Sequence, residues 1–178
     1  MDIQGLQKLT LLDWPGKTAC TVFLGGCDFR CPFCHNSELL EGDLPAELTG
    51  AELLAFLKKR RGLLDGVCVT GGEPLLRPDL AELLSAIKAL DYPVKLDTNG
   101  SHPDRLAALW ERGLVDYVAM DVKNSPARYA QTAGVPGLDL GPIRASVAWL
   151  LEGRVAYEFR TTAVRQFHDS DSFRAIGA

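Results

Sequence analysis

TVFLGGCDFRCPFCHN, residues 21–36, is the segment around which the chain is organised. Its apolar first part is typical of a β-strand, and three cysteines follow at spacings of three and two residues: Cys27, Cys31 and Cys34. Thiolates are soft ligands, which select zinc, copper(I) or iron–sulfur clusters over hard cations. A structural zinc site needs four ligands, and a [4Fe–4S] cluster held only by protein needs four cysteines. Three local thiolates would leave one iron of such a cluster free to bind a substrate.

Two other kinds of site compete with this interpretation. A zinc ion could be completed by His35 or by a distant residue, although His35 directly follows Cys34, which is a poor spacing for binding the same ion. A disulfide framework is the other alternative. The N-terminus lacks the basic flank and apolar stretch of a signal peptide, and no apolar run is long enough to span a bilayer. We therefore expect a cytoplasmic protein, in which clustered cysteines are more often ligands or catalysts than disulfides.

The composition fits one soluble domain. The chain has 178 residues, of which 47% are hydrophobic and 24% are charged, and this is enough to bury a core. The net charge of −4 gives no general reason to expect nucleic acid as a partner. The basic run 58–61 predicts a solvated helix end. We expect residues 1–178 to form a single domain with neither a nucleic-acid nor a membrane partner.

Strand-like and helix-like segments alternate along the chain. The expected strands are residues 19–24, 66–70, 94–97, 115–121 and 155–163, after a short ribbon or irregular lead-in over residues 1–18. The expected helices begin at the capping box of Thr49 and Glu52, near Pro78, at a Ser101 cap, near 141 and at Ser170 or Asp171. This alternation predicts an α/β fold with a parallel sheet and right-handed crossovers. Five strands are too few for a closed eight-stranded barrel, so we expect an open, partial (β/α) barrel.

Polar motifs follow the expected strands: the cysteine loop, GGEP (71–74), DTNG (97–100) and DVK (121–123). In parallel α/β folds the loops after the strands gather on one face, so we expect these separated motifs to meet. Paired glycines let the backbone approach a ligand, and Glu73 could accept a hydrogen bond from an ammonium or hydroxyl group. An ordinary strand-to-helix turn is the alternative for GGEP.

Period-two alternation assigns charged residues to shared faces of their strands. Asp121 and Lys123 lie on one face, and Asp97 shares a face with Lys95. Such pairs need a common partner or each other. A structural ion-pair network inside the barrel is therefore an alternative to a binding role, and it could include the expected strand-five residues Glu158 and Arg160.

The chain resembles the radical S-adenosylmethionine (SAM) enzymes in its Cys-x3-Cys-x2-Cys motif, with aromatic Phe33 before the last cysteine, and in the GGEP that follows the next strand. GCDFRCPFCHN (26–36), DTNG and MDVK (120–123) resemble the glycyl-radical-enzyme activases. GLQKLTLLDWPGK (5–17) looks closest to the activating proteins of anaerobic ribonucleoside-triphosphate reductase. The resemblance runs from about residue 3 to residue 169. It implies the partial-barrel fold of that superfamily.

The resemblance also implies a cofactor arrangement. A [4Fe–4S] cluster would be held by Cys27, Cys31 and Cys34, and the methionyl amine and carboxylate of SAM would chelate its fourth iron. The methionyl ammonium would be received by Gly71, Gly72 and Glu73, partly through backbone carbonyls. The cofactor would carry the chemistry, so no side chain is expected to act as an acid or base.

Further contacts to SAM follow from the same resemblance. Phe33 and its backbone would border the adenine, and Lys123 would approach the ribose or the carboxylate. Asp97 and Asp121 resemble residues that line the site. In a related activase the corresponding residues also surround a monovalent cation. His168 lies where relatives have a polar residue near the adenosine.

The implied reaction begins with one electron from a flavodoxin- or ferredoxin-like donor. The 5′-deoxyadenosyl radical formed from SAM would then abstract hydrogen from a glycine Cα of anaerobic ribonucleoside-triphosphate reductase. A lateral gap in an open barrel could admit the protein loop that carries this glycine. The alternatives are activation of pyruvate formate-lyase or another glycyl radical enzyme, a small-molecule enzyme such as a deazapurine-forming synthase, and a non-catalytic zinc or electron-transfer module.

The end of the chain departs from the resemblance. The sixth strand of the partial barrel is not evident, and barely two turns of helix follow Ser170. We expect either a sequence truncated at its C-terminus or an unusually short family member.

Overall fold

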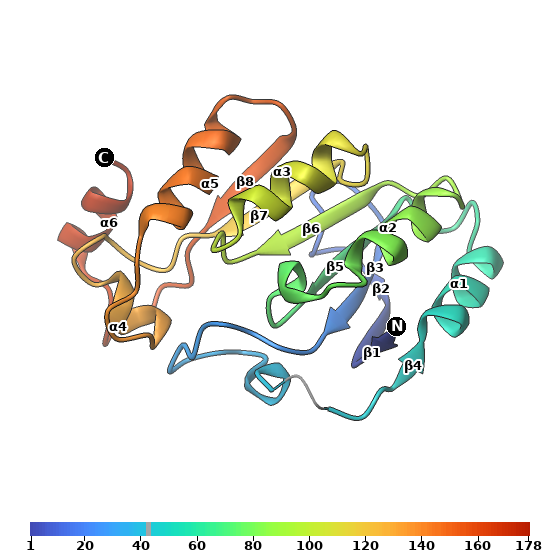
Figure 1. Cartoon of the computed structure of the whole chain (residues 1–178), viewed down its shortest axis with the longest axis horizontal. Helices are drawn as coiled ribbons and strands as arrows, with labels where there is room; N and C mark the ends of the chain where they lie inside the picture. The colour runs from blue at the N-terminus through green and yellow to red at the C-terminus, as the bar shows by residue number, and fades with distance from the viewer. Residues whose placement is uncertain (42–43) are drawn as a thin grey trace.

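The computed structural model describes residues 1–41 and 44–178 (Figure 1). Its main sheet has six strands in the order β2-β3-β5-β6-β7-β8. β2 (Gly5–Thr10) pairs antiparallel with β3 (Ala19–Leu24), and all later pairings are parallel. The remaining strands of this sheet are β5 (Gly66–Gly71), β6 (Val94–Thr98), β7 (Tyr117–Asp121) and β8 (Ala156–Arg160). β1 (Asp2–Ile3) and β4 (Leu48–Thr49) form a separate two-stranded ladder.

Helices connect the parallel strands. They are α1 (Gly50–Lys59), α2 (Leu80–Lys88), α3 (Pro103–Glu111), α4 (Tyr129–Ala133), α5 (Gly141–Leu151) and α6 (Ser170–Ile176), with 3₁₀ turns η1 (Ser37–Leu39) and η2 (Pro74–Leu76). Figure 1 shows α2, α3 and α5 lying across one face of the sheet. In the described part of the chain no helix has the length and apolar character needed to cross a membrane.

The two faces of the sheet differ in chemistry. One row of paired residues beneath the helices is Val22, Val69, Leu96 and Val118, and all four are fully buried. The neighbouring positions point to the other face, because strand side chains alternate. That second face carries the charged residues Lys95, Asp97, Asp121, Glu158 and Arg160. The helix-covered face therefore forms the core, and the second face is available for a site.

Trp14 closes the second face near the starts of the strands. Its ring is buried with Ala19 and Cys68, and its centroid lies 6.0 Å from that of Tyr117. Gly66 leaves room for the indole, because a Cβ there would lie 2.6 Å from a ring carbon. The opposite end of this face, where the strands finish, holds the motifs of interest.

The predicted α/β partial barrel with five parallel strands is confirmed. The lead-in over residues 1–18 is a ribbon, since β2 extends the sheet antiparallel to β3. The fifth parallel strand ends at Arg160 rather than at 163, and the fourth begins at Tyr117 rather than at 115. The capping box of Thr49 and Glu52 is present.

The prediction that Ser101 caps α3 is wrong. The N-cap residue is His102, which makes no side-chain capping bond. The Ser101 hydroxyl lies instead between Asp28 and Asn99, at 2.7 Å and 2.6 Å from their side-chain oxygens. A tertiary contact with the cysteine loop therefore replaces the local cap.

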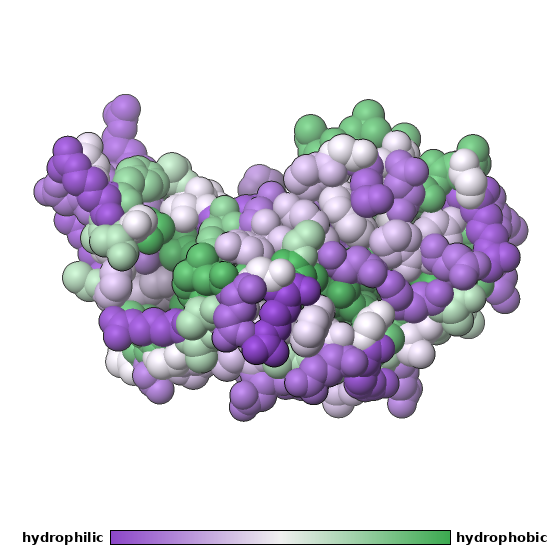
Figure 2. Space-filling model, turned by 90° about the horizontal axis from the view of Figure 1, so that it is seen from above, coloured by the Kyte–Doolittle hydropathy of each residue, from purple (hydrophilic) through white to green (hydrophobic). Residues whose placement is uncertain are grey.

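Figure 2 shows one surface of the molecule, on which hydrophilic residues predominate and apolar residues form small, separate patches. The large exposed apolar side chains of the described residues include Leu9, Leu11 and Leu12, at the end of β2 and in the turn after it.

Candidate functional site

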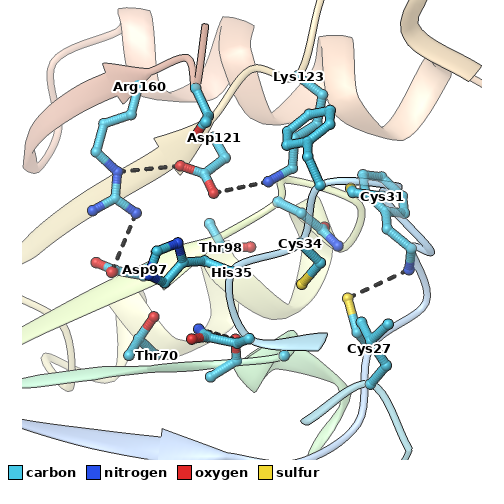
Figure 3. Close-up of a pocket in the computed structure, with 18 residues that line it drawn as sticks. Cys27, Cys31, Cys34, His35, Thr70, Asp97, Thr98, Asp121, Lys123 and Arg160 are labelled. Carbon is cyan, nitrogen blue, oxygen red and sulfur yellow. Dashed lines mark hydrogen bonds and ion pairs between the residues drawn. The ribbon is translucent and has the colours of Figure 1, made fainter. Parts of the chain in front are cut away.

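The cysteine loop and the ends of four strands enclose a cavity of about 310 Å³ (Figure 3). This volume is at the lower end of the range of about 300–1,000 Å³ that is usual for small-molecule sites. The predicted site residues that line it are Cys27, Cys31, Phe33, Cys34, Gly71, Gly72, Asp97, Asp121 and Lys123. The motifs that were expected to meet are therefore brought together, because each follows a neighbouring parallel strand.

The glycine pair of GGEP permits two loops to pack backbone against backbone. Gly71 has φ +129°, and a Cβ at this position would collide with the backbone of Leu24. A Cβ on Gly72 would collide with the carbonyl of Gly26. In return, the Gly72 N–H donates to the Leu24 carbonyl at 2.8 Å and the Glu73 N–H to the Gly26 carbonyl at 2.7 Å. The glycines thus set the start of the cysteine loop as well as one wall of the cavity.

Glu73 is the predicted site residue that does not line the cavity. Its side chain is fully buried, and its carboxylate accepts from the N–H of Leu75 at 3.0 Å, the Thr98 hydroxyl at 3.0 Å and the N–H of Asn99 at 2.6 Å. These bonds join the loop after β5 to the loop after β6. In this structure the Glu73 carboxylate is a loop-positioning group, which leaves only its backbone for a ligand ammonium.

Glu73 also makes the stability of the fold depend on pH. Burial raises the pKa of its carboxyl to about 7, while hydrogen bonds from Asn99, Leu75 and Thr98 oppose the rise. The folded protein therefore binds this proton more tightly than the unfolded chain does. The stability contributed by this group is greatest below the ordinary pKa of 4.5 and falls as the pH rises towards 7. We expect the loss to be about 3 kcal/mol.

Glu73→Gln tests this expectation, because the amide cannot titrate. The free energy of unfolding of both proteins would be measured by urea denaturation between about pH 4.5 and 8. The advantage of wild type over E73Q should shrink with rising pH and level off above about pH 7. A difference that stays constant across this range would contradict the prediction.

The cysteine loop is held from two sides. The Asp28 carboxylate accepts from the Asn99 amide and from the Ser101 hydroxyl, both at 2.7 Å, which fastens the loop to DTNG. On the other side, the Arg30 N–H donates to the carbonyl of Ala133 at 2.8 Å. The next residue, Gly134, ends α4 with φ +68°, and a Cβ there would collide with the Arg30 carbonyl.

Asp28→Ala is expected to destabilise the fold by about 3 kcal/mol, because it removes a carboxylate acceptor from two hydrogen bonds, each worth at least about 1.5 kcal/mol. Ser101→Ala removes one of the two and should cost about half as much. Urea denaturation of the two variants would measure both effects. Equal stabilities for wild type and D28A would show that the tether to DTNG does not hold the loop.

The pKa values of two of the three thiols are raised in the unliganded fold. Burial raises the pKa of Cys27 to about 11, with a hydrogen bond from the Phe29 N–H opposing it, and burial also raises the pKa of Cys31, although nearby Lys123 lowers it. Across residues 1–41 and 44–178, no three His, Cys, Asp or Glu side chains already stand as a metal-binding group. Binding a cluster therefore requires the thiols to deprotonate and turn towards a common centre.

The donor set nevertheless fits an iron–sulfur cluster. Three cysteines from one short loop line one side of the cavity, and the remaining walls are supplied by the strand ends. His35 lines the cavity as well, but it is exposed and forms no metal-binding group with the cysteines in the described residues. Soft sulfur donors beside an open cavity suit a cluster that keeps one iron for a ligand.

A chain of ion pairs runs along the second face of the sheet to the cavity, and Figure 3 shows the part of it from Asp97 to Lys123. Its successive distances are 3.6 Å for Glu158–Lys95, 2.6 Å for Lys95–Asp97, 3.2 Å for Asp97–Arg160, 3.2 Å for Arg160–Asp121 and 2.9 Å for Asp121–Lys123. Lys95 is fully buried, so its carboxylate partners compensate for its lost hydration. Burial lowers the pKa of Lys123, but Asp121, together with Cys31 and Tyr129, raises it by more. The ion-pair network that the strand pattern allowed is therefore present.

Aromatic side chains connect the cysteine loop to the segment after β8. The ring of Phe33 lies 5.4 Å from that of Phe167 and 6.5 Å from that of His168, between centroids. His168 is buried outside the cavity lining, and its Nε2 lies 2.9 Å from the Lys123 carbonyl oxygen. His168 thus fixes the strand end that carries Lys123.

Sequence reasoning did not assign several of the cavity-lining residues to the site. They include Asn36, Thr70, Thr98, Asn99, Arg160 and Thr162. Asn36 donates to the Gly71 carbonyl at 3.1 Å, and it lies within the cysteine motif itself. Thr98 and Asn99 belong to DTNG, so their position directly after a strand was an available signal. Arg160 was expected in the ion-pair network but not in the cavity wall.

A model of the radical SAM superfamily matches residues 21–171. This chain belongs to the radical SAM superfamily. The match includes the cysteine loop and the strand ends that form the cavity of this radical SAM protein. Membership implies a [4Fe–4S] cluster and S-adenosylmethionine as cofactors.

Three curated relatives show similarity to this radical SAM chain. A protein of Methanocaldococcus jannaschii, provisionally named a glycyl-radical enzyme activating enzyme, is 36% identical over 68% of this chain and 50% of its own length. The pyruvate formate-lyase-activating enzyme of Clostridium pasteurianum is 32% identical over 68% and 52%. The 7-carboxy-7-deazaguanine synthase of Hyperthermus butylicus is 34% identical over 71% and 50%. The chain thus spans about half the length of these relatives.

A solved structure supports the fold of the chain. Streptococcus suis SuiB, crystallised with its precursor peptide SuiA, superposes with a TM-score of 0.65. The aligned part has 17% sequence identity and covers 88% of this chain and 35% of that chain. This likeness shows that the fold of this chain, with its mostly parallel sheet, occurs in SuiB as well.

Proposed function

We propose that this radical SAM protein is the activating enzyme of a glycyl radical enzyme, with anaerobic ribonucleoside-triphosphate reductase as its protein substrate. Residues 1–178 would form one radical SAM domain. The observation that carries the proposal is the single cavity that unites the cysteine loop with GGEP, DTNG and DVK. The two activating enzymes among the relatives support the enzyme class.

The cysteine loop would hold the [4Fe–4S] cluster through Cys27, Cys31 and Cys34. Given one electron from a flavodoxin- or ferredoxin-like protein, a cluster held there would supply the reductive cleavage of SAM to methionine and a 5′-deoxyadenosyl radical. The protein's own part is to bind, orient and shield the nucleotide. The cavity is suited to this because its walls come from strand ends that are fixed by backbone pairing.

The remaining walls offer groups that match the two ends of SAM. Lys123 presents positive charge for the carboxylate or a donor for the ribose. The backbone of Gly71 and Gly72 can approach the methionyl ammonium without hindrance from a Cβ. Phe33 supplies an aromatic face for the adenine at the cavity edge. These are the roles that the family resemblance implies, and the place of each group in the cavity supports them.

The choice of reductase rests on the lead-in segment GLQKLTLLDWPGK, which forms β2 and the turn that carries Trp14. Pyruvate formate-lyase is the second candidate, because its activating enzyme from Clostridium pasteurianum is among the relatives. The similarity to a 7-carboxy-7-deazaguanine synthase favours a third candidate function, that of a radical enzyme acting on a small molecule.

Anaerobic reconstitution with iron and sulfide, followed by reduction in the presence of SAM, tests the proposal in two stages. Formation of 5′-deoxyadenosine is expected, and its absence would favour a non-catalytic metal or electron-transfer module. In the second stage the protein is mixed with anaerobic ribonucleoside-triphosphate reductase or with pyruvate formate-lyase, and the glycyl radical is sought by EPR. A radical on the reductase supports the proposal. A radical on pyruvate formate-lyase alone, or on neither enzyme, would overturn the assigned partner.

A further inference from the structure

Arg160 stands between the two aspartates that end neighbouring strands (Figure 3). Its Nε lies 3.2 Å from Asp121 Oδ1, and an Nη lies 3.2 Å from Asp97 Oδ2. β8 supplies the guanidinium, while β6 and β7 supply the carboxylates, so the bridge ties together three strand ends.

Each aspartate has a second cationic partner on its other oxygen. Lys95 Nζ is 2.6 Å from Asp97 Oδ1, and Lys123 Nζ is 2.9 Å from Asp121 Oδ2. All four carboxylate oxygens therefore face a charged nitrogen donor. A monovalent metal ion binds through oxygen ligands, and here it would have to displace at least one of these donors.

The positive and negative charges of the ion-pair network are also equal in number. Lys95, Lys123 and Arg160 carry three positive charges, and Asp97, Asp121 and Glu158 carry three negative charges. Burial lowers the pKa of Arg160, but the two aspartates raise it by more, so the guanidinium stays charged. The network has no excess negative charge to attract another cation, and the guanidinium would repel one.

We propose that the guanidinium of Arg160 takes the place between Asp97 and Asp121 that the activase resemblance assigns to a monovalent cation, so that this protein needs neither sodium nor potassium at its site. Arg160 is then a positioning residue, which holds two carboxylates in the cavity wall through a planar, two-pronged donor. The expected effect of Arg160 on SAM affinity rests on the proposed function, whereas its expected effect on the stability of the fold is independent of that function.

The first test exchanges the salt. The melting temperature and SAM dissociation constant of the cluster-reconstituted protein are measured in potassium, sodium or tetramethylammonium chloride at equal ionic strength. Tetramethylammonium is too large and too weakly coordinating to replace a metal ion between two carboxylates. We expect wild type to show the same melting temperature within about 1 °C and SAM affinities within about twofold. A clear requirement for potassium or sodium would overturn the proposal.

Arg160→Gln provides the converse test, since it leaves the network with one uncompensated negative charge. The variant should melt several degrees higher in potassium than in tetramethylammonium, because a bound ion stabilises the folded state. Its SAM affinity should fall about tenfold in tetramethylammonium and recover in potassium. Arg174→Gln is the matched control, because it removes an exposed Arg–Asp pair in α6 and should respond to neither salt.

The outcomes separate this inference from the proposed function. If the protein bound no SAM in any salt, the proposed function would be wrong. The melting temperatures would still test whether Arg160 replaces a monovalent cation. An R160Q protein that is indifferent to the salt would overturn the inference. If that variant did not fold, the salt exchange on wild type would still decide the question.

Discussion

Replacing Cys31 with alanine is expected to abolish cluster binding and to lower reductive SAM cleavage by more than about 100-fold. Loss of groups that only support metal ligands costs about 10–100-fold, and loss of a ligand should cost more. The thiol lies in the cavity wall, and no other cysteine of the described residues lines the cavity apart from Cys27 and Cys34. Iron and sulfide content and 5′-deoxyadenosine formation are the measurements.

Cys20→Ala is the matched control for this experiment. Cys20 is buried in the helix-covered core, far along β3 from the loop, and its pKa is raised to about 12 by burial. The variant should keep its cluster and its activity. A C31A protein with full iron and undiminished cleavage would mean that the cluster is held by other groups, and it would remove the basis of the proposed site.

Gly71→Ala is expected to destabilise the fold by about 4 kcal/mol. The φ of +129° is rarely adopted by residues with a Cβ, which costs about 1–3 kcal/mol. The added methyl group would also collide with the backbone of Leu24, which cannot move without breaking the pairing of β3 and β5. Overpacking of this kind costs about 1–3 kcal/mol more. Urea denaturation would measure the loss.

Gly113→Ala separates the two causes. Gly113 also has a positive φ, +68°, but a Cβ there would meet nothing within 4 Å. This control should lose only the cost of the strained backbone, about 1–2 kcal/mol. If G71A and G113A were equally stable, the close approach of the two loops would not be the reason for the glycine.

The sequence predicts correctly those strands and helix caps that depend on residues close together in the chain. The strand 19–24 was predicted to the residue, because a β-branched and apolar run is bounded by Thr18 and by a glycine pair. The capping box at Thr49 is likewise encoded within four residues. The meeting of the motifs at one edge followed from parallel topology alone.

The features that were missed depend on contacts between distant segments. α4 has only five residues, and it is held by the hydrogen bond from the Arg30 N–H to the Ala133 carbonyl and by the close approach of Gly134 to Arg30, rather than by an apolar stripe of its own. The direction of the Glu73 side chain is set by donors at the end of β6 and in the loop after it, 25 and 26 residues away. Arg160 reaches the cavity wall because β8 pairs with β7 in a register that sets Arg160 beside Asp121. A local sequence pattern does not predict this register.

Trp14 fills the open barrel at the end where the strands begin. In the described residues, Trp14 and Tyr117 pack together at the end of the second face opposite the cavity, so a ligand of the cavity would enter and leave on the side of the cysteine loop. Under the proposed function, a protein loop inserted there would trap the spent nucleoside beneath it. Each encounter would then deliver a single radical, and turnover would wait for the partner to withdraw.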